Sequence, residues 1–279
     1  CRHWQRSNRL GSRWRRGRMS LLSARKVGKV GARALGKTLG RMAGRTAGDA
    51  LRGGSNGSAA GIAASATTSG SSAAGRSCKV VAIDGNIGSG KSTLLKMLKE
   101  QFKAEGQKVC FAPERTHEWK GLLPLYYEDT ERWSFPFQMQ VLLSHIRNLK
   151  EASEQQADLL FVERSPLTAQ LVFGHLLKDE GLITKVESDL FDDFMSEVAW
   201  KPDAIVYLEC APELCMKRII QRSTTGESGI PLDYLNGVSK AYSKYLADYA
   251  GRLPVIRIDS SKETPEIFDQ LVDAMSKIV

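Results

Sequence analysis

The stretch KVVAIDGNIGSGKSTLLKML, residues 79–98, decides the fold. It begins with the short apolar run Lys79–Ile83, which is rich in β-branched residues and predicts a strand. The loop of residues 85–92 then fits the pattern G-x-x-x-x-G-K-[ST], and a helical pattern starts at Lys91. A strand, a glycine-rich loop and a helix in this order are typical of a site that holds phosphate groups.

Each residue type in this loop has a chemical reason to be there. Glycines let backbone N–H groups close around phosphate oxygens, and the start of the helix adds a partial positive charge. We expect Lys91 to reach the β- and γ-phosphates of a nucleoside triphosphate and the Ser92 hydroxyl to bind Mg²⁺. The predicted ATP phosphate-binding residues are Gly85, Asn86, Ile87, Gly88, Ser89, Gly90, Lys91, Ser92 and Thr93. The loop alone leaves ATPases, GTPases, nucleotide kinases and small-molecule kinases open.

Residues 78–279 alternate strand-like and helical patterns, which predicts an α/β domain with a parallel sheet and helices on both faces. The predicted strands are Lys79–Ile83, Lys108–Ala112, Leu159–Val162, Ala204–Glu209 and Val255–Ile258. The predicted helices are Lys91–Glu105, Phe135–Ala152, Leu167–Leu177, Ser188–Ala199, Pro212–Arg222 and Pro231–Tyr249.

The N-terminal part has a different composition. Residues 1–77 contain 16 Lys and Arg against one acid, Asp49, so their net charge of +15 leaves −6 for residues 78–279 from the chain's total of +9. Residues 1–52 are basic, with Met19 as a candidate start, and residues 53–77 have the Gly, Ser and Ala content of a flexible linker. This composition predicts an organelle transit peptide, mitochondrial ahead of plastid, with the basic tail of a cytoplasmic protein as the alternative. Because the positive charge lies outside the folded domain, it does not indicate a nucleic-acid partner.

The apolar runs and the cysteines argue against a membrane-spanning protein and against a cysteine-based metal site. No apolar run approaches the ~20 residues that a membrane span needs, so we expect no stable membrane insertion. The five cysteines contain no C-x-x-C pair and no histidine at metal-ligand spacing. Their odd number is typical of free thiols in a reducing compartment.

Further motifs follow the phosphate loop. They are Glu114-Arg-Thr-His-Glu-Trp119 after the second predicted strand, Trp133-Ser-Phe-Pro-Phe-Gln138 in the long predicted helix, Glu163-Arg164-Ser165 after the third strand, and Arg218-x-x-x-Arg222 before Glu227-Ser-Gly-Ile-Pro-Leu-Asp-Tyr-Leu235. With these motifs in this order, from about Val80 to Asp259, the chain resembles the deoxyribonucleoside kinase family, the group of thymidine, deoxycytidine and deoxyguanosine kinases. The resemblance implies a P-loop kinase fold with five parallel strands and a short arginine-bearing lid. It also implies Mg²⁺- and ATP-dependent 5′-phosphorylation of deoxyribonucleosides, in salvage for DNA precursor synthesis.

The resemblance gives roles to the charged residues of these motifs. Glu114 matches the general base that takes the proton from the sugar 5′-hydroxyl, and Arg164 matches the arginine beside the transferring phosphate. Glu163 matches the acid that holds Mg²⁺ together with Ser92. All three motif residues follow strands, at the edge of a parallel sheet where such folds bind ligands, and a planar multi-donor cation suits a phosphoryl group. Glu114, Arg164 and Lys91 are the predicted catalytic residues.

A nucleoside pocket is implied as well. Gln138 matches the amide that reads the base edge, while Tyr127 and Glu227 match a pair that hydrogen-bonds the 3′-hydroxyl of a deoxyribose. Cytidine- and purine-accepting relatives carry Arg and Asp where this chain has His145 and Ala169, and the space beside Ala169 favours thymidine and deoxycytidine. His145 remains open between a hydrogen bond to the base and space filling in the helix interior. The predicted nucleoside-binding residues are Trp119, Tyr127, Gln138, Val141, His145, Arg164, Ala169, Phe173 and Glu227.

Arg218 and Arg222 match arginines of a lid that closes over the phosphates and excludes water. The chain departs from the family pattern at three positions. Arg115 stands where proline is usual, Thr224 where a further lid arginine is frequent, and Gly226 where an acid is frequent. We expect a differently shaped loop around the general base, and a lid that is slower or uses another cation, as the consequences.

Two alternatives remain open at this point. A nucleoside monophosphate kinase such as thymidylate kinase would share the phosphate loop but surround its acceptor with a different arrangement of acids and arginines. A non-enzymatic nucleoside-kinase-like subunit of mitochondrial respiratory complex I would share the fold but would be free to lose Lys91, Glu114 or Arg164, which this chain retains. The resemblance further implies a homodimer, through helices such as Phe135–Ala152.

Overall fold

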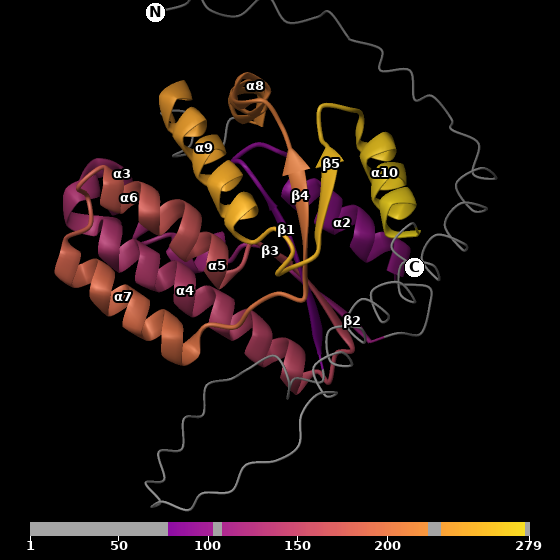
Figure 1. Ribbon diagram of the computed structural model, residues 1–279, viewed down its shortest axis with the longest axis horizontal. Helices are drawn as coiled ribbons and strands as arrows, with labels where there is room; N and C mark the ends of the chain where they lie inside the picture. Colours follow the sequence, from indigo (N-terminus) through magenta and orange to yellow (C-terminus); the bar gives the residue numbers. More distant parts are fainter. Residues whose placement is uncertain (1–77, 103–107, 223–229, 277–279) are drawn as a thin grey trace, which may run out of the picture.

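The computed structural model describes residues 78–102, 108–222 and 230–276. Its centre is a sheet of five parallel strands in the order β2-β3-β1-β4-β5 (Figure 1). The strands are β1 (Lys79–Gly85), β2 (Val109–Ala112), β3 (Leu159–Glu163), β4 (Ala204–Glu209) and β5 (Val255–Asp259). This confirms the predicted α/β fold with a five-stranded parallel sheet. The predicted transit peptide and linker, together with Thr224, Gly226 and Glu227, lie outside the described residues.

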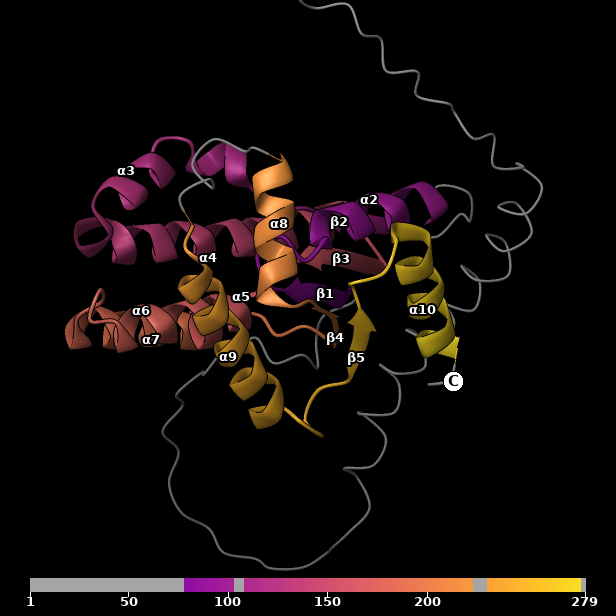
Figure 2. The same cartoon turned by 90° about the horizontal axis from the view of Figure 1, so that it is seen from above.

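Helices cover both faces of the sheet. Helices α2 (Lys91–Phe102) and α10 (Thr264–Ser276) lie on one face, and α4 (Thr130–Glu154), α5 (Pro166–Thr168) and α9 (Leu232–Asp248) lie on the other (Figures 1 and 2). The remaining elements are a 3₁₀ turn (Thr116–Trp119), α3 (Leu123–Glu128), a π-helical segment (Ala169–Gly174), α6 (His175–Asp179), α7 (Lys185–Val198) and α8 (Pro212–Arg222).

The alternation of side chains along β1 divides the core in two. Val81 and Ile83 pack with the α2 and α10 layer, whereas Val80 and Ala82 pack with the α4 and α9 layer. All four side chains are buried. A strand covered on both faces has no solvent side for polar residues, which is why the run before the phosphate loop is continuously apolar.

Helix α4 begins five residues before the predicted start at Phe135. The Asp129 side chain caps it by accepting a hydrogen bond from the Arg132 N–H at 3.0 Å. Pro136 then lies inside the helix, where the loss of one N–H donor is tolerated. This longer helix carries the predicted base-reading residues on one rigid element.

The helix predicted over Leu167–Leu177 is instead three consecutive pieces, because the chain widens into a π-helical segment between α5 and α6. Such a π-helical turn is frequent at functional sites. Helix α7 begins earlier than predicted, at a capping box formed by Thr184 and Glu187. Helices α3 and α10 were not predicted. Within the described residues, every helix is too short or too polar to cross a membrane.

Candidate active site

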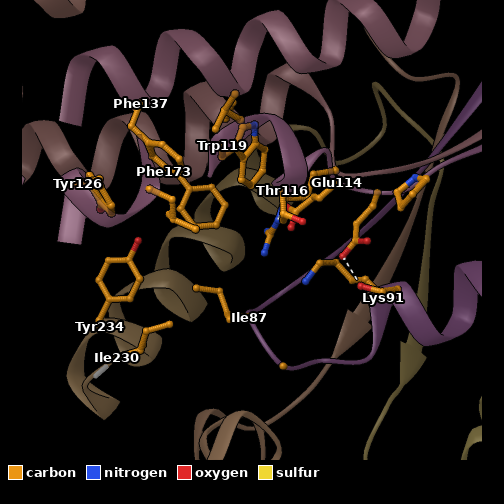
Figure 3. Close-up of a pocket in the computed structure, with 18 of the residues that line it drawn as sticks. Ile87, Lys91, Glu114, Thr116, Trp119, Tyr126, Phe137, Phe173, Ile230 and Tyr234 are labelled. Carbon is orange, nitrogen blue, oxygen red and sulfur yellow. Dashed lines mark hydrogen bonds and ion pairs between the residues drawn. The ribbon is translucent and has the colours of Figure 1, made fainter. Parts of the chain in front are cut away.

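A cleft of about 1110 Å³ opens at the carboxyl ends of the strands. Glu114 follows β2, Glu163 and Arg164 end and follow β3, and the phosphate loop follows β1, so neighbouring strands place these groups at one edge of the sheet. Figure 3 shows Glu114 and Lys91 at one end of the cleft, and the rings of Tyr126, Phe137 and Phe173 at the other. The cleft therefore has a charged end and an aromatic end.

Glycine is required at two positions of the phosphate loop. Gly85 and Gly88 have φ values of +146° and +80°. A Cβ atom at Gly85 would lie 2.8 Å from the Leu208 carbonyl oxygen, and one at Gly88 would lie 2.6 Å from the Cys215 carbonyl oxygen. Both the backbone conformation and the neighbouring main chain exclude a side chain.

Three predicted phosphate-loop residues, Gly85, Asn86 and Ser89, do not line the cleft. The Asn86 amide donates to the Leu235 carbonyl at 2.9 Å and to the Ser239 hydroxyl at 3.0 Å, which ties the loop to α9. These residues build the loop, while Ile87, Gly88, Gly90, Lys91, Ser92 and Thr93 face the cleft.

Lys91 is buried at the bottom of the loop, where its Nζ donates to the Asn86 carbonyl oxygen at 2.8 Å. Burial and the nearby positive charge of Arg164 lower the pKa of Lys91 to about 8, although the Glu163 carboxylate opposes the shift. The Ser92 hydroxyl beside it donates to Glu163 Oε1 at 3.0 Å. A cation and two hard oxygen groups thus lie next to the loop.

Glu114 and Arg164 form an ion pair at the floor of the cleft, with Arg164 Nε 2.5 Å from Glu114 Oε1. Partial burial acts to raise the pKa of Glu114, but the charges of Arg164 and Lys91 and the hydrogen bond from Arg164 outweigh it, so the pKa lies below its usual value. Glu114 is therefore a carboxylate at neutral pH. Its side chain keeps 24% of its surface exposed, which leaves it accessible to a ligand in the cleft.

Arg164 is held from several sides. Its Nη1 donates to the Gly85 carbonyl oxygen at 3.1 Å and to the Tyr242 hydroxyl at 2.5 Å, and its guanidinium lies 4.7 Å from the centre of the Phe173 ring. Its φ of +63° is uncommon for a residue with a side chain, and strained backbone of this kind clusters at functional sites.

Asp84 completes this network from below. It is fully buried, and it accepts hydrogen bonds from the Thr168 hydroxyl at 2.8 Å and the Tyr242 hydroxyl at 3.2 Å. Burial raises the pKa of Asp84, although the charge of Arg164 and the hydrogen bond from Thr168 oppose the shift. The chain Asp84–Tyr242–Arg164–Glu114 links the buried core to the cleft.

The aromatic end of the cleft is a preformed pocket. Trp119 packs edge-on against Phe137 with ring centres 5.5 Å apart, and Tyr126 stacks on Phe137 at 4.8 Å. The Trp119 Nε1 donates to the Ser144 hydroxyl of α4 at 2.9 Å, which fixes the orientation of the ring. Tyr234 of α9 lines the opposite wall (Figure 3). Flat apolar walls of this kind suit a planar ring.

Two residues that line the cleft each contain a buried polar atom with no hydrogen-bond partner among the described residues. These atoms are Gln138 Oε1 and His145 Nδ1, both on α4 and both in side chains that are about 4% exposed. Burial lowers the pKa of His145 to about 4 against the raising effect of Glu114, so the imidazole is neutral at physiological pH. A buried polar atom without a partner is costly, so Gln138 and His145 are the candidate polar contacts of this pocket.

All nucleoside-binding residues that were predicted within the described part of the chain line this one cleft. The remaining predicted residue, Glu227, lies outside the described residues. Arg218 and Arg222 also line the cleft, from α8. The Arg218 Nη2 donates to the Ser260 carbonyl oxygen at 2.8 Å, so this guanidinium is anchored to the loop after β5.

Sequence reasoning missed several residues of the site. Asp84 and Tyr242 were given no role, nor were the pocket walls Tyr126, Phe137 and Tyr234. An acid at the end of a continuously apolar strand was the available signal for Asp84, since acids are rarely buried without a partner. Tyr234 and Tyr242 gave no signal, because within the predicted helix Pro231–Tyr249 they match core positions.

Known proteins resemble this chain over most of its length. The sequence model of the deoxynucleoside kinase family matches residues 81–279. The chain is 33% identical over 205 residues to the thymidine kinase of Ictalurid herpesvirus 1, covering 71% of this chain and 86% of that protein. It is 28% identical over 247 residues to the deoxycytidine kinase of Homo sapiens, covering 75% and 94% respectively. It is also 28% identical over 216 residues to a probable deoxycytidine kinase of Fowlpox virus, covering 72% and 89%.

Proposed function

The chain belongs to the deoxynucleoside kinase family, and on that premise we propose that it transfers the γ-phosphate of ATP to the 5′-hydroxyl of a pyrimidine deoxyribonucleoside. One observation carries the proposal. The Glu114 carboxylate, bound by Arg164, lies in the same cleft as the phosphate-loop Lys91 and an aromatic pocket with unpaired polar atoms. A general base thus stands between a site for the donor and a site for the acceptor.

The reaction follows from this arrangement. The 5′-oxygen forms a bond to the γ-phosphorus while the bond between that phosphorus and the bridging oxygen of ADP breaks, and the hydroxyl proton passes to Glu114. A carboxylate with a low pKa is a weak base, but a loose phosphoryl-transfer transition state needs little proton abstraction before the oxygen attacks. Lys91 and Arg164 lie where they can stabilise negative charge on the transferring group.

Ser92 and Glu163 fit a Mg²⁺ ion. Magnesium in kinases is bound by hydroxyl and carboxylate oxygens together with the substrate's own phosphates, so it needs no cluster of acids from the protein. Among the described residues, no group of three His, Cys, Asp or Glu could hold a metal. When bound, the ion would neutralise charge on the phosphate oxygens.

The preference for pyrimidines rests on the walls of the pocket. The Gln138 amide offers one donor and one acceptor, and by turning over it can pair with the edge of either thymine or cytosine. The neutral His145 adds a further donor or acceptor. Ala169 is buried and small, so it leaves space for a methyl group and provides no acid for an amino group. In this proposal the products enter salvage for DNA synthesis.

A substrate panel tests the proposal. We expect the full-length protein, with ATP and Mg²⁺, to form the monophosphates of thymidine and deoxycytidine with a higher kcat/KM than those of deoxyadenosine and deoxyguanosine. Chromatography of the products and release of ADP measure this. Phosphorylation of thymidine monophosphate in place of thymidine would favour a monophosphate kinase, and no turnover of any substrate would favour a non-enzymatic role. Purine preference would overturn the base assignment alone.

Helix α7 supports the proposed homodimer. Its residues Val186, Leu190, Phe194 and Val198 recur every fourth position and are 41–77% exposed. A neighbouring side of α7 buries Phe191 and Met195 against α4. We propose that a second copy of this chain covers the stripe. When two copies are related by a twofold axis, the stripe of one copy can pack against the same stripe of the other, so the surface is complementary to itself.

Light scattering after gel filtration tests this interface. We expect the wild type to have about twice the 30.7 kDa mass of one chain, and Phe194→Lys to shift the mass to that of a monomer, since a charge would be buried at the contact. Ile220→Lys, a change at an apolar residue of α8 that is 62% exposed against 44% for Phe194, is the matched control and should remain dimeric. A dimeric Phe194→Lys variant would show that this stripe is not the interface.

A further inference from the structure

The segment that carries Glu114 is bound to α4 through its neighbour, Arg115. Glu114 lies between the end of β2 and the 3₁₀ turn Thr116–Trp119, outside the hydrogen-bonded ladder of the sheet. Arg115 precedes the turn with φ −83° and ψ 49°, and its carbonyl oxygen accepts from the Glu118 N–H at 2.8 Å. The φ value is close to the roughly −65° that a proline ring enforces, but the side chain does something that proline cannot.

Each nitrogen of the Arg115 guanidinium has an acceptor. Nε donates to Asn148 Oδ1 at 2.5 Å, Nη1 donates to Glu118 Oε1 at 2.8 Å, and Nη2 forms an ion pair with Glu151. Asn148 and Glu151 belong to α4, whereas Glu118 belongs to the turn itself. The Arg115 side chain is 14% exposed and that of Glu118 is 16% exposed, so this ion pair is shielded from water more than a typical surface pair, whereas Glu151 is 53% exposed.

A second arginine of α4 closes the network. Arg147 Nη1 donates to the other carboxylate oxygen of Glu118 at 2.6 Å. Glu118 therefore lies between two guanidinium groups, one from its own segment and one from α4. At the far end of the same turn, the Trp119 indole is bound to Ser144 of α4. The turn is thus attached to α4 at both ends.

The same helix presents Gln138 and His145 to the pocket. A fixed attachment between α4 and the Glu114 segment would therefore set the distance between the carboxylate and whatever α4 holds. Arg115 does not line the cleft, so its side chain can act on the reaction only through its neighbours.

We propose that Arg115 is a positioning residue, which clamps the segment carrying Glu114 to α4 so that the carboxylate meets the acceptor hydroxyl of a nucleoside bound along that helix. This inference rests on the proposed function. The clamp contributes to the orientation of the Glu114 carboxylate and not to the affinity for either substrate.

A double-mutant cycle between Arg115 and Glu114 tests the proposal in the full-length protein. Arg115→Met keeps the apolar stem but removes all three donors. We expect it to lower kcat for thymidine about 10- to 100-fold, the scale of a displacement of roughly 1 Å at a reacting group. The KM values for thymidine and ATP should stay within about threefold of the wild type, because the pocket walls and phosphate loop are untouched.

The second half of the cycle separates positioning from a general structural role. In a Glu114→Gln background, where there is no base left to position, Arg115→Met should change kcat by less than about twofold. An equal loss in both backgrounds, or a loss that appears in KM, would overturn the proposal. Lys150→Met, at an exposed cation of the same helix beside Glu151, is the matched control and should leave both backgrounds unchanged.

A conservative variant guards against misfolding. Arg115→Lys keeps the charge but has one nitrogen in place of three, so its kcat should lie between those of the wild type and Arg115→Met. If Arg115→Met does not fold, Arg115→Lys takes its place in the cycle with the same expected non-additivity. A failure of the proposed function would be visible separately, as absent turnover in the wild type or as unchanged turnover in Glu114→Gln alone.

Discussion

Glu114→Gln is expected to lower kcat for thymidine about 10³-fold, within the range of roughly 10²–10⁴ that a general base contributes. The amide keeps the size of the side chain and retains an oxygen that can accept the hydrogen bond from Arg164 Nε, now 2.5 Å from the carboxylate. It cannot take a proton. KM for thymidine should therefore change little, because the aromatic walls and Gln138 are not altered. Steady-state kinetics with varied thymidine measures both parameters.

The variant needs a control for the loss of one negative charge. Glu154→Gln removes an exposed carboxylate from the end of α4 that does not line the cleft, and should leave kcat unchanged. Turnover of Glu114→Gln within a few-fold of the wild type would show that another group accepts the proton, or that none is required. Loss of folding is checked by the thermal unfolding transition.

The charged end of the cleft could be predicted from the sequence because its residues occur in short motifs at strand ends. Parallel strands bring their carboxyl ends to one edge of a sheet, so residues that follow β1, β2 and β3 meet whatever the lengths of the connections. Lys91, Glu114 and Arg164 lie within one cleft for that reason.

The support for Arg164 could not be predicted, because it depends on tertiary contacts. Tyr242 is separated from Arg164 by 78 positions and has no motif around it. Its hydroxyl meets the guanidinium only because α9 packs against β1 and β3 on one face of the sheet. The left-handed backbone of Arg164 is likewise invisible in the sequence, since any residue type can occupy such a conformation when its surroundings compel it.

The replacement of a family proline by Arg115 shows a third kind of limit. The resemblance marks Arg115 as a departure from the family pattern, and from this the sequence predicts a loop of altered shape. The structure has a proline-like φ at this position together with an ion network to α4. Which acceptors a long side chain reaches depends on the packing of a helix more than thirty positions away, and residue type alone cannot supply that.

Arg164→Lys is the second change for which we expect a large effect. Arg164 donates simultaneously to Glu114, Gly85 and Tyr242 and covers the Phe173 ring. Lysine keeps the positive charge but has one nitrogen, which cannot reach these acceptors together. We expect kcat to fall about 10²- to 10³-fold, the scale measured for loss of one preorganised donor to developing charge.

This substitution should also lower stability, unlike Glu114→Gln. Without the guanidinium, the Gly85 carbonyl oxygen and the Tyr242 hydroxyl each lose a hydrogen bond from a charged donor, and such a bond contributes about 1.5–3 kcal/mol. For a domain of this size that corresponds to a decrease in Tm of a few degrees, about 2–4 °C per kcal/mol. Calorimetry together with kinetics of the purified variant measures the two effects separately.

Arg257→Lys is the matched control, because Arg257 also pairs with a carboxylate, Glu209, and also lies over an aromatic ring, that of Tyr207 at 5.8 Å. It is half exposed and outside the cleft, so both kcat and Tm should stay close to the wild type. If Arg164→Lys retained full kcat while losing stability, the guanidinium would serve the fold alone. If kcat fell while Tm was unchanged, the stability contributed by Asp84 and Tyr242 would not depend on the guanidinium. The expected joint loss arises because one side chain connects the buried carboxylate to the catalytic one.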